Sequence, residues 1–366
     1  MKKIILFING LSSGGAEHQL VQLADGLIEN GYNVTITTFG DSYDHYSFSP
    51  LIMRHRIAYG KSKFIKMLAV WKYFMTINAD WVIAFGQRES LLALEGLIFR
   101  SQHKIQVIAG DRNITNGKPT FTEKLLTHIF YKRADYIVPN SYSQKKHIIE
   151  TTPIYKDKTI TITNYTDLTK FTPTILPQGN SLRIGIFSRY HEQKNCMRFV
   201  DVVRQLKERA QQPFVIEWYG NQHFKGNLPN SQYQTMKEKV EQYDLANVLM
   251  LKDHVKDVQS LMPRFDAICL PSLREGFSNS IGEAICCGKP CLVSDVADNK
   301  VMVQDGINGF LFNPQDTNAI VEAFQKYFAL TSVQRQRMGD ASRQRAEDLF
   351  NRERFLTAYT ELLESL

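Results

Sequence analysis

Residues 267–295, AICLPSLREGFSNSIGEAICCGKPCLVSD, constrain the fold of this chain more than any other stretch. The apolar run Ala267–Leu270 predicts a buried strand. A loop follows, and then a helical pattern from about Ser278 to Cys287, which Gly288 ends at its C′ position. The run Cys291–Ser294 predicts a second strand. This order predicts a βαβ unit whose loop lies at the carboxyl end of a parallel strand, where open α/β sheets bind ligands.

Two carboxylates, Glu275 and Glu283, are eight positions apart in this unit. Gly276 lets a ligand approach the backbone between them, and the helix begins with the N–H groups of Phe277, Ser278 and Asn279. A nucleotide sugar fits such a site, with sugar hydroxyls on Glu275, its diphosphate at the helix N-terminus and its ribose diol on Glu283. Either glutamate alone is better interpreted as a solvated charge, so the prediction depends on the combination with the flanking strands and glycines.

The segment EGFSNSIGEAICCGKP resembles the Glu-x7-Glu motif of the family-four retaining glycosyltransferases, the "glycosyl transferases group 1" set. This resemblance extends over nearly the whole chain. It implies an α/β protein with the GT-B fold, in which two Rossmann-like doubly wound domains face each other across a cleft. It further implies transfer of a sugar from a nucleoside diphosphate with retention of configuration, and a role for Glu275 in orienting that sugar.

The length of 366 residues is too great for one ordinary core and predicts two domains. We expect an acceptor-binding domain over 1–172 and a linker over 173–181, which is rich in Pro and Gly and lacks periodicity. A nucleotide-sugar-binding domain should span 182–349. By resemblance, residues 350–366 form a helix that crosses back to the first domain.

The net charge of +7 is unevenly distributed along the chain. Residues 1–172 hold 21 Lys and Arg against 14 Asp and Glu, whereas residues 173–366 hold 23 of each. The first half should therefore seek an anionic partner. The five cysteines have no paired metal spacing and are interpreted as reduced and buried.

The first domain opens with a predicted strand, Lys3–Ile8, followed by a glycine-containing loop and an amphipathic helix that Asn30 and Gly31 end. The loop lacks the Gly-x-Gly-x-x-Gly spacing of a dinucleotide site. Resemblance implies instead that Gly14 approaches the acceptor and Gly15 the donor. Further strands are expected at 34–39, 81–85, 105–109 and 136–138.

A second loop follows the strand that ends at Ala109, and it contains Asp111, Arg112 and Asn113. Relatives often have a histidine near this point that contacts the transferred sugar, but this chain has none between His103 and His128. We expect these three residues to bind the acceptor, because Arg112 suits an anionic group. A surface pair of Asp111 and Arg112 explains them equally well.

The second domain begins with a predicted strand over 182–188, followed by Arg189 and Lys194 before a helix from about Cys196. Two cations at a strand-to-helix turn suit a leaving diphosphate, since each charge-assisted bond contributes about 1.5 to 3 kcal/mol. By resemblance these cations are the family's catalytic pair, and Val255 borders the nucleotide base. Strands are expected at 214–219 and 248–251, a turn at 305–310, and helices from Thr317, Ser332 and Arg352.

The chain has no Asp-x-Asp triplet to hold a metal diphosphate. We therefore expect metal-independent chemistry with no cofactor, in which Arg189, Lys194 and the helix dipole replace the metal. Resemblance implies a front-face mechanism in which the leaving phosphate accepts the acceptor's proton.

Two other classes of protein share some of these features. A sugar-nucleotide epimerase can share the two-domain shape and the phosphate site, but it would need no acceptor. A nucleic-acid-binding protein would suit the basic first half, but it would not need Glu275 and Glu283, and the chain lacks an aromatic-basic recognition motif. The favoured function is a hexosyltransferase-like step in cell-surface polysaccharide or glycolipid synthesis.

Residues 61–75, KSKFIKMLAVWKYFM, form an amphipathic helical pattern. One broad apolar face is flanked by lysines on both margins and comprises Phe64, Met67, Leu68, Trp71, Phe74 and Met75. This face could pack on the core, or it could enter an anionic membrane surface while the lysines snorkel. Because the whole charge excess lies in this half, we predict a cytoplasmic protein bound peripherally to the inner leaflet, with a saccharide or lipid-linked saccharide acceptor.

Overall fold

The computed structural model describes residues 1–12, 14–40, 44–58, 62–98, 100, 104–111, 121–175, 179, 181–223 and 228–365, without the side chains of 121–124. It divides into two compact units. The first comprises Met1–Asn164 with Arg352–Leu366, and the second comprises Tyr165–Asn351. The C-terminal helix thus belongs to the first unit, although its predecessor in the chain belongs to the second.

The first unit is built on a six-stranded parallel sheet with strand order β3-β2-β1-β4-β5-β6. Its strands are β1 (Lys3–Ile8), β2 (Asn33–Thr38), β3 (Met53–Arg56), β4 (Trp81–Phe85), β5 (Gln106–Asp111) and β6 (Tyr136–Pro139). Every residue of β4 is buried, as expected of a strand with helices on both faces. The strand order reverses between β1 and β4, which makes this the topological switch point of the sheet.

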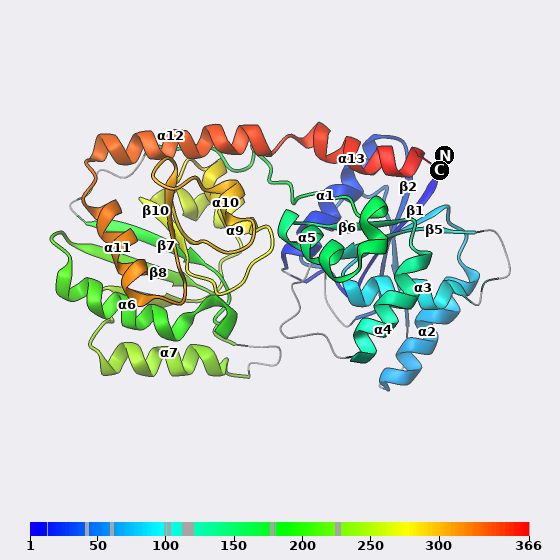
Figure 1. Cartoon of the computed structure of the whole chain (residues 1–366), viewed down its shortest axis with the longest axis horizontal. Helices are drawn as coiled ribbons and strands as arrows, with labels where there is room; N and C mark the ends of the chain where they lie inside the picture. The colour runs from blue at the N-terminus through cyan, green and yellow to red at the C-terminus, as the bar shows by residue number, and fades with distance from the viewer. Residues whose placement is uncertain are drawn as a thin grey trace. The chain divides into compact units, whose positions relative to one another are not determined.

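The helices of the first unit follow the strands in alternation. They are α1 (Gly15–Glu29), α2 (Lys63–Thr76), α3 (Gln87–Ile98), α4 (Phe121–Phe130), η1 (Tyr131–Arg133), α5 (Tyr142–Thr151), η2 (Pro153–Lys158) and α13 (Arg352–Glu364). Helix α1 ends as predicted, since Gly31 has a φ of +83° and the N–H of Asn30 bonds to the carbonyl of Gly26. Helix α13 packs on α1 (Figure 1).

The second unit repeats the architecture, with strand order β12-β11-β10-β7-β8-β9. Its strands are β7 (Leu182–Phe187), β8 (Phe214–Tyr219), β9 (Leu249–Lys252), β10 (Ala267–Leu270), β11 (Cys291–Ser294) and β12 (Gly309–Phe312). All ladders are parallel. The switch point lies between β7 and β10, so the loops that leave these two strands meet at one edge of the sheet.

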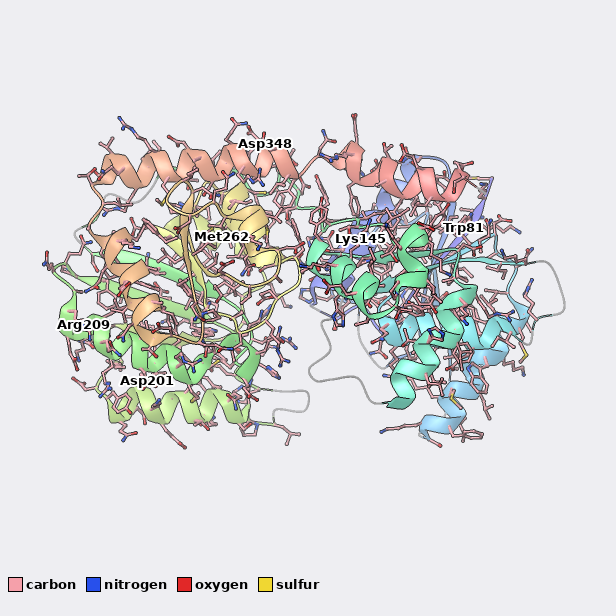
Figure 2. The ribbon with its side chains drawn as sticks, viewed as in Figure 1. Trp81, Lys145, Asp201, Arg209, Met262 and Asp348 are labelled. Atoms are coloured by element: carbon pink, nitrogen blue, oxygen red, sulfur yellow. The ribbon has the colours of Figure 1, made fainter. Side chains whose placement is uncertain are left out.

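Helices cover both faces of the second sheet (Figure 1). They are α6 (Cys196–Arg209), α7 (Ser231–Gln242), α8 (Val258–Leu261), η5 (Met262–Arg264), α9 (Asn279–Cys286), α10 (Asn299–Met302), α11 (Thr317–Phe328) and α12 (Ser332–Leu349), with η3 (Glu192–Lys194) before α6. Helices α6, α7 and α11 pack together in one layer, and α9, α10 and α12 in another. Met262 of this unit and Trp81 of the first unit, both labelled in Figure 2, are fully buried.

Two predictions about local structure need correction. Strand β3, MRHR, was not expected, because it is a polar and largely exposed edge strand without an apolar pattern. Helix α2 forms, but the predicted apolar face is divided: Phe74 is buried in the core, whereas Phe64 is 62% exposed. Lys61, Arg112 and Asn113, which carried sequence predictions, lie outside the described residues.

Candidate active site

The candidate site lies at the carboxyl edge of the second sheet, at the switch point between β7 and β10. Residues 188–195 follow β7, and residues 271–278 follow β10. The cation pair, the first glutamate and the start of the glutamate-bearing helix all fall in these two loops. Parallel strands bring their carboxyl ends together, and this is how residues some 80 positions apart become neighbours.

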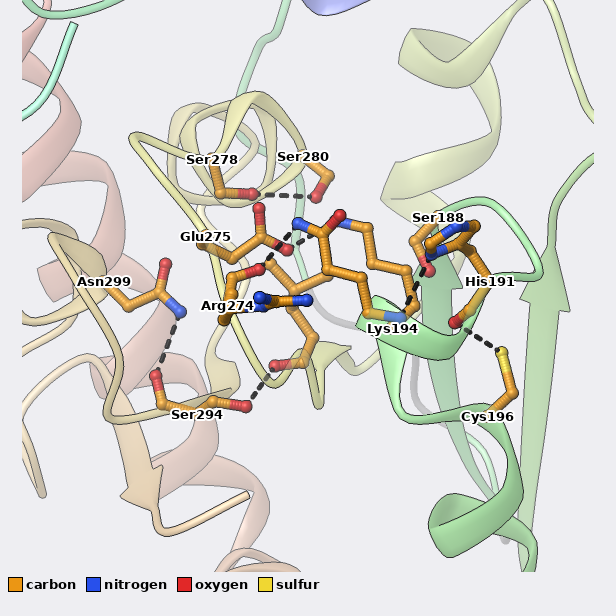
Figure 3. A network of polar contacts seen from close by, with 12 residues as sticks. Ser188, His191, Lys194, Cys196, Arg274, Glu275, Ser278, Ser280, Ser294 and Asn299 are labelled. Carbon is orange, nitrogen blue, oxygen red and sulfur yellow. Dashed lines mark hydrogen bonds and ion pairs between the residues drawn. The ribbon is translucent and has the colours of Figure 1, made fainter. Parts of the chain in front are cut away.

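Lys194 and Glu275 form an ion pair across the switch point. The Lys194 ammonium donates to Oε1 of Glu275, and both side chains are largely withdrawn from solvent. Figure 3 shows the two side chains pointing toward one another from the two loops. A carboxylate that is only 8% exposed needs such a partner, because an unpaired buried charge is strongly destabilising. Lys194 thus supplies the partner that the buried Glu275 carboxylate requires.

Backbone contacts hold the two loops in place around this pair. The N–H of Leu273 donates to the carbonyl of Gln193 at 2.8 Å, and the Gln193 amide donates back to the carbonyl of Arg274 at 2.8 Å. His191 shapes the first loop, since its Nδ1 accepts from the N–H of Gln193 at 3.1 Å. Asn195 then turns the chain into α6 with a φ of +62°. The site is therefore preorganised by contacts that are independent of any ligand.

Arg189 stands at the end of β7 on the same loop as Lys194 and is exposed. No hydrogen bond or ion pair of its guanidinium is seen within the part of the chain that the structure describes. The two cations of the loop therefore differ: Lys194 is paired, and Arg189 faces solvent. An exposed guanidinium with five donors is available to an incoming anion.

Helix α9 carries the second glutamate. Glu283 is half-buried, and desolvation raises the pKa of its carboxyl to about 7, an effect that the Lys170 charge partly offsets. Ser278 is the N-cap residue, but its hydroxyl makes no capping bond and lies 3.2 Å from that of Ser280 instead. The first turn of α9 therefore receives no side-chain cap from Ser278, and a helix N-terminus of this kind attracts anions.

The remaining residues predicted to bind the donor have mixed surroundings. Phe277 is buried and packs edge-to-face on Phe350 at 6.2 Å, so only its backbone can serve a ligand. Gly276 and Asn279 are half-buried beside it. Val255 is half-buried in the loop after β9.

The predicted acceptor residues lie at the carboxyl edge of the first sheet. Gly14 is the N-cap residue of α1, and a side chain there would collide with the Glu17 carboxylate, which would be 2.1 Å from its Cβ. Gly15, which was predicted to approach the donor, is the first residue of α1 and is exposed. Asp111, at the end of β5, is buried and accepts a hydrogen bond from the Gln144 amide at 2.5 Å. The edge of the second sheet therefore joins two of its predicted residues, Lys194 and Glu275, in an ion pair, whereas Asp111 has an internal structural partner.

Gln193 and His191 are the site residues that sequence reasoning did not assign. Their signal is weak because both precede Lys194 in what reads as an ordinary polar turn. The asparagine at position 195 could have suggested a tight turn, because Asn is one of the residues that tolerate the left-handed conformation seen there. Within the described residues, no group of three or more His, Cys, Asp or Glu side chains is arranged to hold a metal ion.

Comparison with known families assigns both halves of the chain. A model described as "Glycosyl transferases group 1" matches residues 172–345, and one described as "Glycosyltransferase Family 4" matches residues 13–170. The chain belongs to the family-four, group 1 glycosyltransferases. This confirms the family that the Glu-x7-Glu motif predicted.

Curated glycosyltransferases of known name resemble parts of the chain. The UDP-Gal:alpha-D-GlcNAc-diphosphoundecaprenol alpha-1,3-galactosyltransferase of Escherichia coli is 29% identical over 44% of this chain and 43% of its own length. A putative glycosyltransferase of Bacillus subtilis, EpsF, is 30% identical over 34% of this chain and 30% of its own length. The chain thus matches less than half the length of these relatives.

Solved glycosyltransferase structures match the entire chain. Sucrose-phosphate synthase from Thermosynechococcus elongatus has a TM-score of 0.83 at 18% identity, covering 100% of this chain and 99% of that one. Anabaena HepE, solved in complex with UDP and glucose, has a TM-score of 0.83 at 17% identity with complete coverage of both chains. These similarities confirm the predicted two-domain GT-B fold. In the described part of this glycosyltransferase, no helix combines the length and the apolar character needed to cross a bilayer.

Proposed function

We propose that the protein transfers a sugar from a nucleoside diphosphate to a saccharide acceptor with retention of configuration. The observation that carries the proposal is the Lys194–Glu275 pair at the switch point, with the exposed Arg189 on the loop of Lys194 and Glu283 in the helix that follows the loop of Glu275. This set supplies cations for a diphosphate and two carboxylates for hydroxyl groups. The HepE complexes with UDP and with UDP-glucose support a nucleotide-sugar donor.

Each donor group has a proposed partner. Glu283 accepts the ribose hydroxyls, and its raised pKa means that the carboxyl is only partly ionised near neutral pH before the ligand arrives. Arg189 and Lys194 bind the diphosphate together with the start of α9. Glu275 accepts hydroxyls of the transferred sugar, Gly276 permits the close approach, and Val255 borders the base.

The proposed chemistry proceeds on one face of the sugar. The bond between the anomeric carbon and the phosphate oxygen breaks as the acceptor oxygen bonds to the same face, and the acceptor proton passes to the departing phosphate. Lys194 must then shift from Glu275 toward the phosphate as negative charge develops there. In this proposal Arg189 and Lys194 provide the electrostatic stabilisation, and no metal ion is required.

The acceptor is proposed to be a saccharide or lipid-linked saccharide, bound by Gly14 and Asp111 with Arg112 and Asn113, at the cytoplasmic face of the inner membrane. The name of the Escherichia coli relative includes a diphosphoundecaprenol-linked sugar, and this supports a lipid-linked acceptor in cell-surface polysaccharide or glycolipid synthesis.

The test is a screen of UDP- and GDP-sugars by thermal shift, followed by turnover with the stabilising donor. A ligand at about 100 times its dissociation constant should stabilise its unit by about 2.7 kcal/mol. Proton NMR of the product should show the donor's anomeric configuration at the new linkage, with turnover undiminished by EDTA. Release of an epimerised free sugar or nucleotide sugar without an acceptor would instead identify an epimerase, and an inverted linkage would reject the proposed mechanism.

A further inference from the structure

Helix α2 divides its apolar residues between two sides. Val70 and Phe74 are fully buried, and Phe74 packs edge-to-face on Phe7 at 4.9 Å between ring centroids. Trp71 is half-buried and its indole N–H donates to Glu95 of α3 at 3.2 Å. These contacts fix the rotation of the helix about its axis. The rest of its apolar surface cannot also reach the core.

Four large apolar side chains are left on the outside of α2, and we call them the α2 outer face. They are Phe64 at 62% exposed, Ile65 at 50%, Leu68 at 43% and Met75 at 37%. Phe64, Leu68 and Met75 lie within about 40° of one another in helical projection. Single exposed apolar residues are ordinary, but a cluster on one helix face indicates a surface that contacts something else.

The charged residues of α2 are all cations, since the helix contains no Asp or Glu. Lys63 and Lys72 are exposed on opposite sides of the stripe formed by Phe64, Leu68 and Met75, with Ile65 beyond Lys72. Arg100 adds a third cation at the C-terminal end, where its guanidinium donates to the carbonyls of Met75 and Ile77 at 3.2 and 2.8 Å. Lys66 does not contribute to the margin, because its ammonium lies 4.9 Å from the centre of the Phe39 ring.

We propose that the α2 outer face docks on an anionic lipid bilayer, with Phe64, Ile65, Leu68 and Met75 entering the interface and Lys63 and Lys72 contacting the headgroups. An apolar stripe between cations has the charge and polarity of an interfacial helix. A second copy of the chain fits less well, because symmetric pairing would bring the lysines of two helices together. The proposal rests on the proposed function only in that a lipid-linked acceptor would lie in the same membrane.

Sedimentation with phosphatidylcholine vesicles, with and without about one third phosphatidylglycerol, tests the docking. The full chain should pellet with the anionic vesicles and be released by salt. Phe64→Ser with Leu68→Ser should lower the partition coefficient at least about tenfold. Lys63→Gln and Lys72→Gln should each lower it about fivefold. The matched controls are Ile307→Ser with Val333→Ser, at similarly exposed sites of the second unit, and Lys237→Gln with Lys256→Gln.

Equal pelleting on neutral and anionic vesicles would overturn the proposal, as would equal losses in the outer-face variants and their controls. A dimer in solution that Leu68→Ser dissociates, without vesicle binding, would assign the face to a second copy instead. Donor hydrolysis or turnover with a soluble acceptor separates this test from the proposed function. Turnover without vesicle binding rejects only the docking, and vesicle binding without turnover on any donor rejects only the glycosyl transfer.

Discussion

The two units share one architecture but keep their charges in different places. Among the described residues, the first unit buries one charged side chain, Asp111, whereas the second buries Glu217, Asp266, Glu275, Lys289 and Asp298. The first unit has 22 Lys and Arg against 16 Asp and Glu, a net +6, and the second has 22 against 21, a net +1. Twelve of the sixteen exposed large apolar side chains in the described structure also belong to the first unit.

This contrast indicates a division of labour on a common scaffold. A buried charge must be paired or hydrogen-bonded, so each one restricts its neighbours and marks a site or a structural junction. We therefore expect the chemistry of the second unit at the edge of its sheet, where Lys194 and Glu275 pair. The first unit instead has surplus cations and exposed apolar side chains, which suit the proposed acceptor and membrane partners. Three sets of substitutions probe this division, in order of decreasing effect.

The largest effect is expected from Lys194→Ala. Removal of this cation leaves Glu275 buried without its partner and removes a preorganised stabiliser of the leaving phosphate. Turnover should fall roughly 10²-fold or more, and Arg189→Ala should have an effect of the same order. Steady-state kinetics on the folded variants provide the measurement.

Lys237→Ala is the matched control for this loss, because Lys237 pairs with Glu241 on the exposed face of α7 at 3.8 Å. Its turnover should equal that of the wild type, since an exposed pair contributes little. Wild-type rates for Lys194→Ala would remove the switch-point loop from the mechanism and place the chemistry elsewhere.

The second unit was easier to predict than the first, and its buried charges explain why. The sequence around Glu275 and Glu283 combines strands, glycines and carboxylates, and few structures satisfy all of them together. Helices α11 and α12 begin at Thr317 and Ser332 as expected. The Lys194–Glu275 contact itself spans 81 positions and is visible only once the order of β7 and β10 is known.

In the first unit, the missing information is tertiary. Strand β3 depends on contacts that its sequence does not reveal: Arg54 donates to Thr38 on β2 and to both carboxylate oxygens of Asp44. Helix α2 is apolar on two sides, so its pattern alone could not decide which side faces the core. The packing of Val70 and Phe74 decides it.

A smaller effect should come from Glu283→Gln, measured as nucleotide affinity against pH. In the wild type, affinity for the nucleoside diphosphate should rise through about pH 7, because only the ionised carboxylate accepts two ribose hydroxyls. Below that pKa, affinity should fall by up to about tenfold per pH unit. The Gln variant should bind more weakly at pH 8 and lose this pH dependence, as titration calorimetry with UDP and GDP would show.

Stability provides an independent readout of the same group. Folding raises the pKa of Glu283, so the folded protein holds this proton more tightly than the unfolded chain. Its contribution to stability is present in acid and is lost as pH rises through 7, and Glu283→Gln should therefore raise Tm at pH 8 more than at pH 5.

Glu275→Gln is the variant to compare with Glu283→Gln in ligand binding: it should weaken binding of the intact donor and spare binding of the nucleoside diphosphate. Equal losses for both ligands in both variants would reject the separate roles.

The smallest effect concerns the attachment of α13 to the first unit. Tyr32, just after α1, donates its hydroxyl to Glu364 of α13 at 2.6 Å, while Lys2 pairs with the same carboxylate at 3.2 Å. Tyr32→Phe removes the first contact and leaves the ring in place, so it should cost about 1 kcal/mol or less. Hydrogen exchange monitored by mass spectrometry should show faster exchange in α13 and α1 with no change in the second unit. Helix α13 follows α12 of the second unit directly in the chain. Faster exchange in α12 as well would therefore mean that α13 stabilises both units, and that the boundary after Asn351 does not separate two independently stable units.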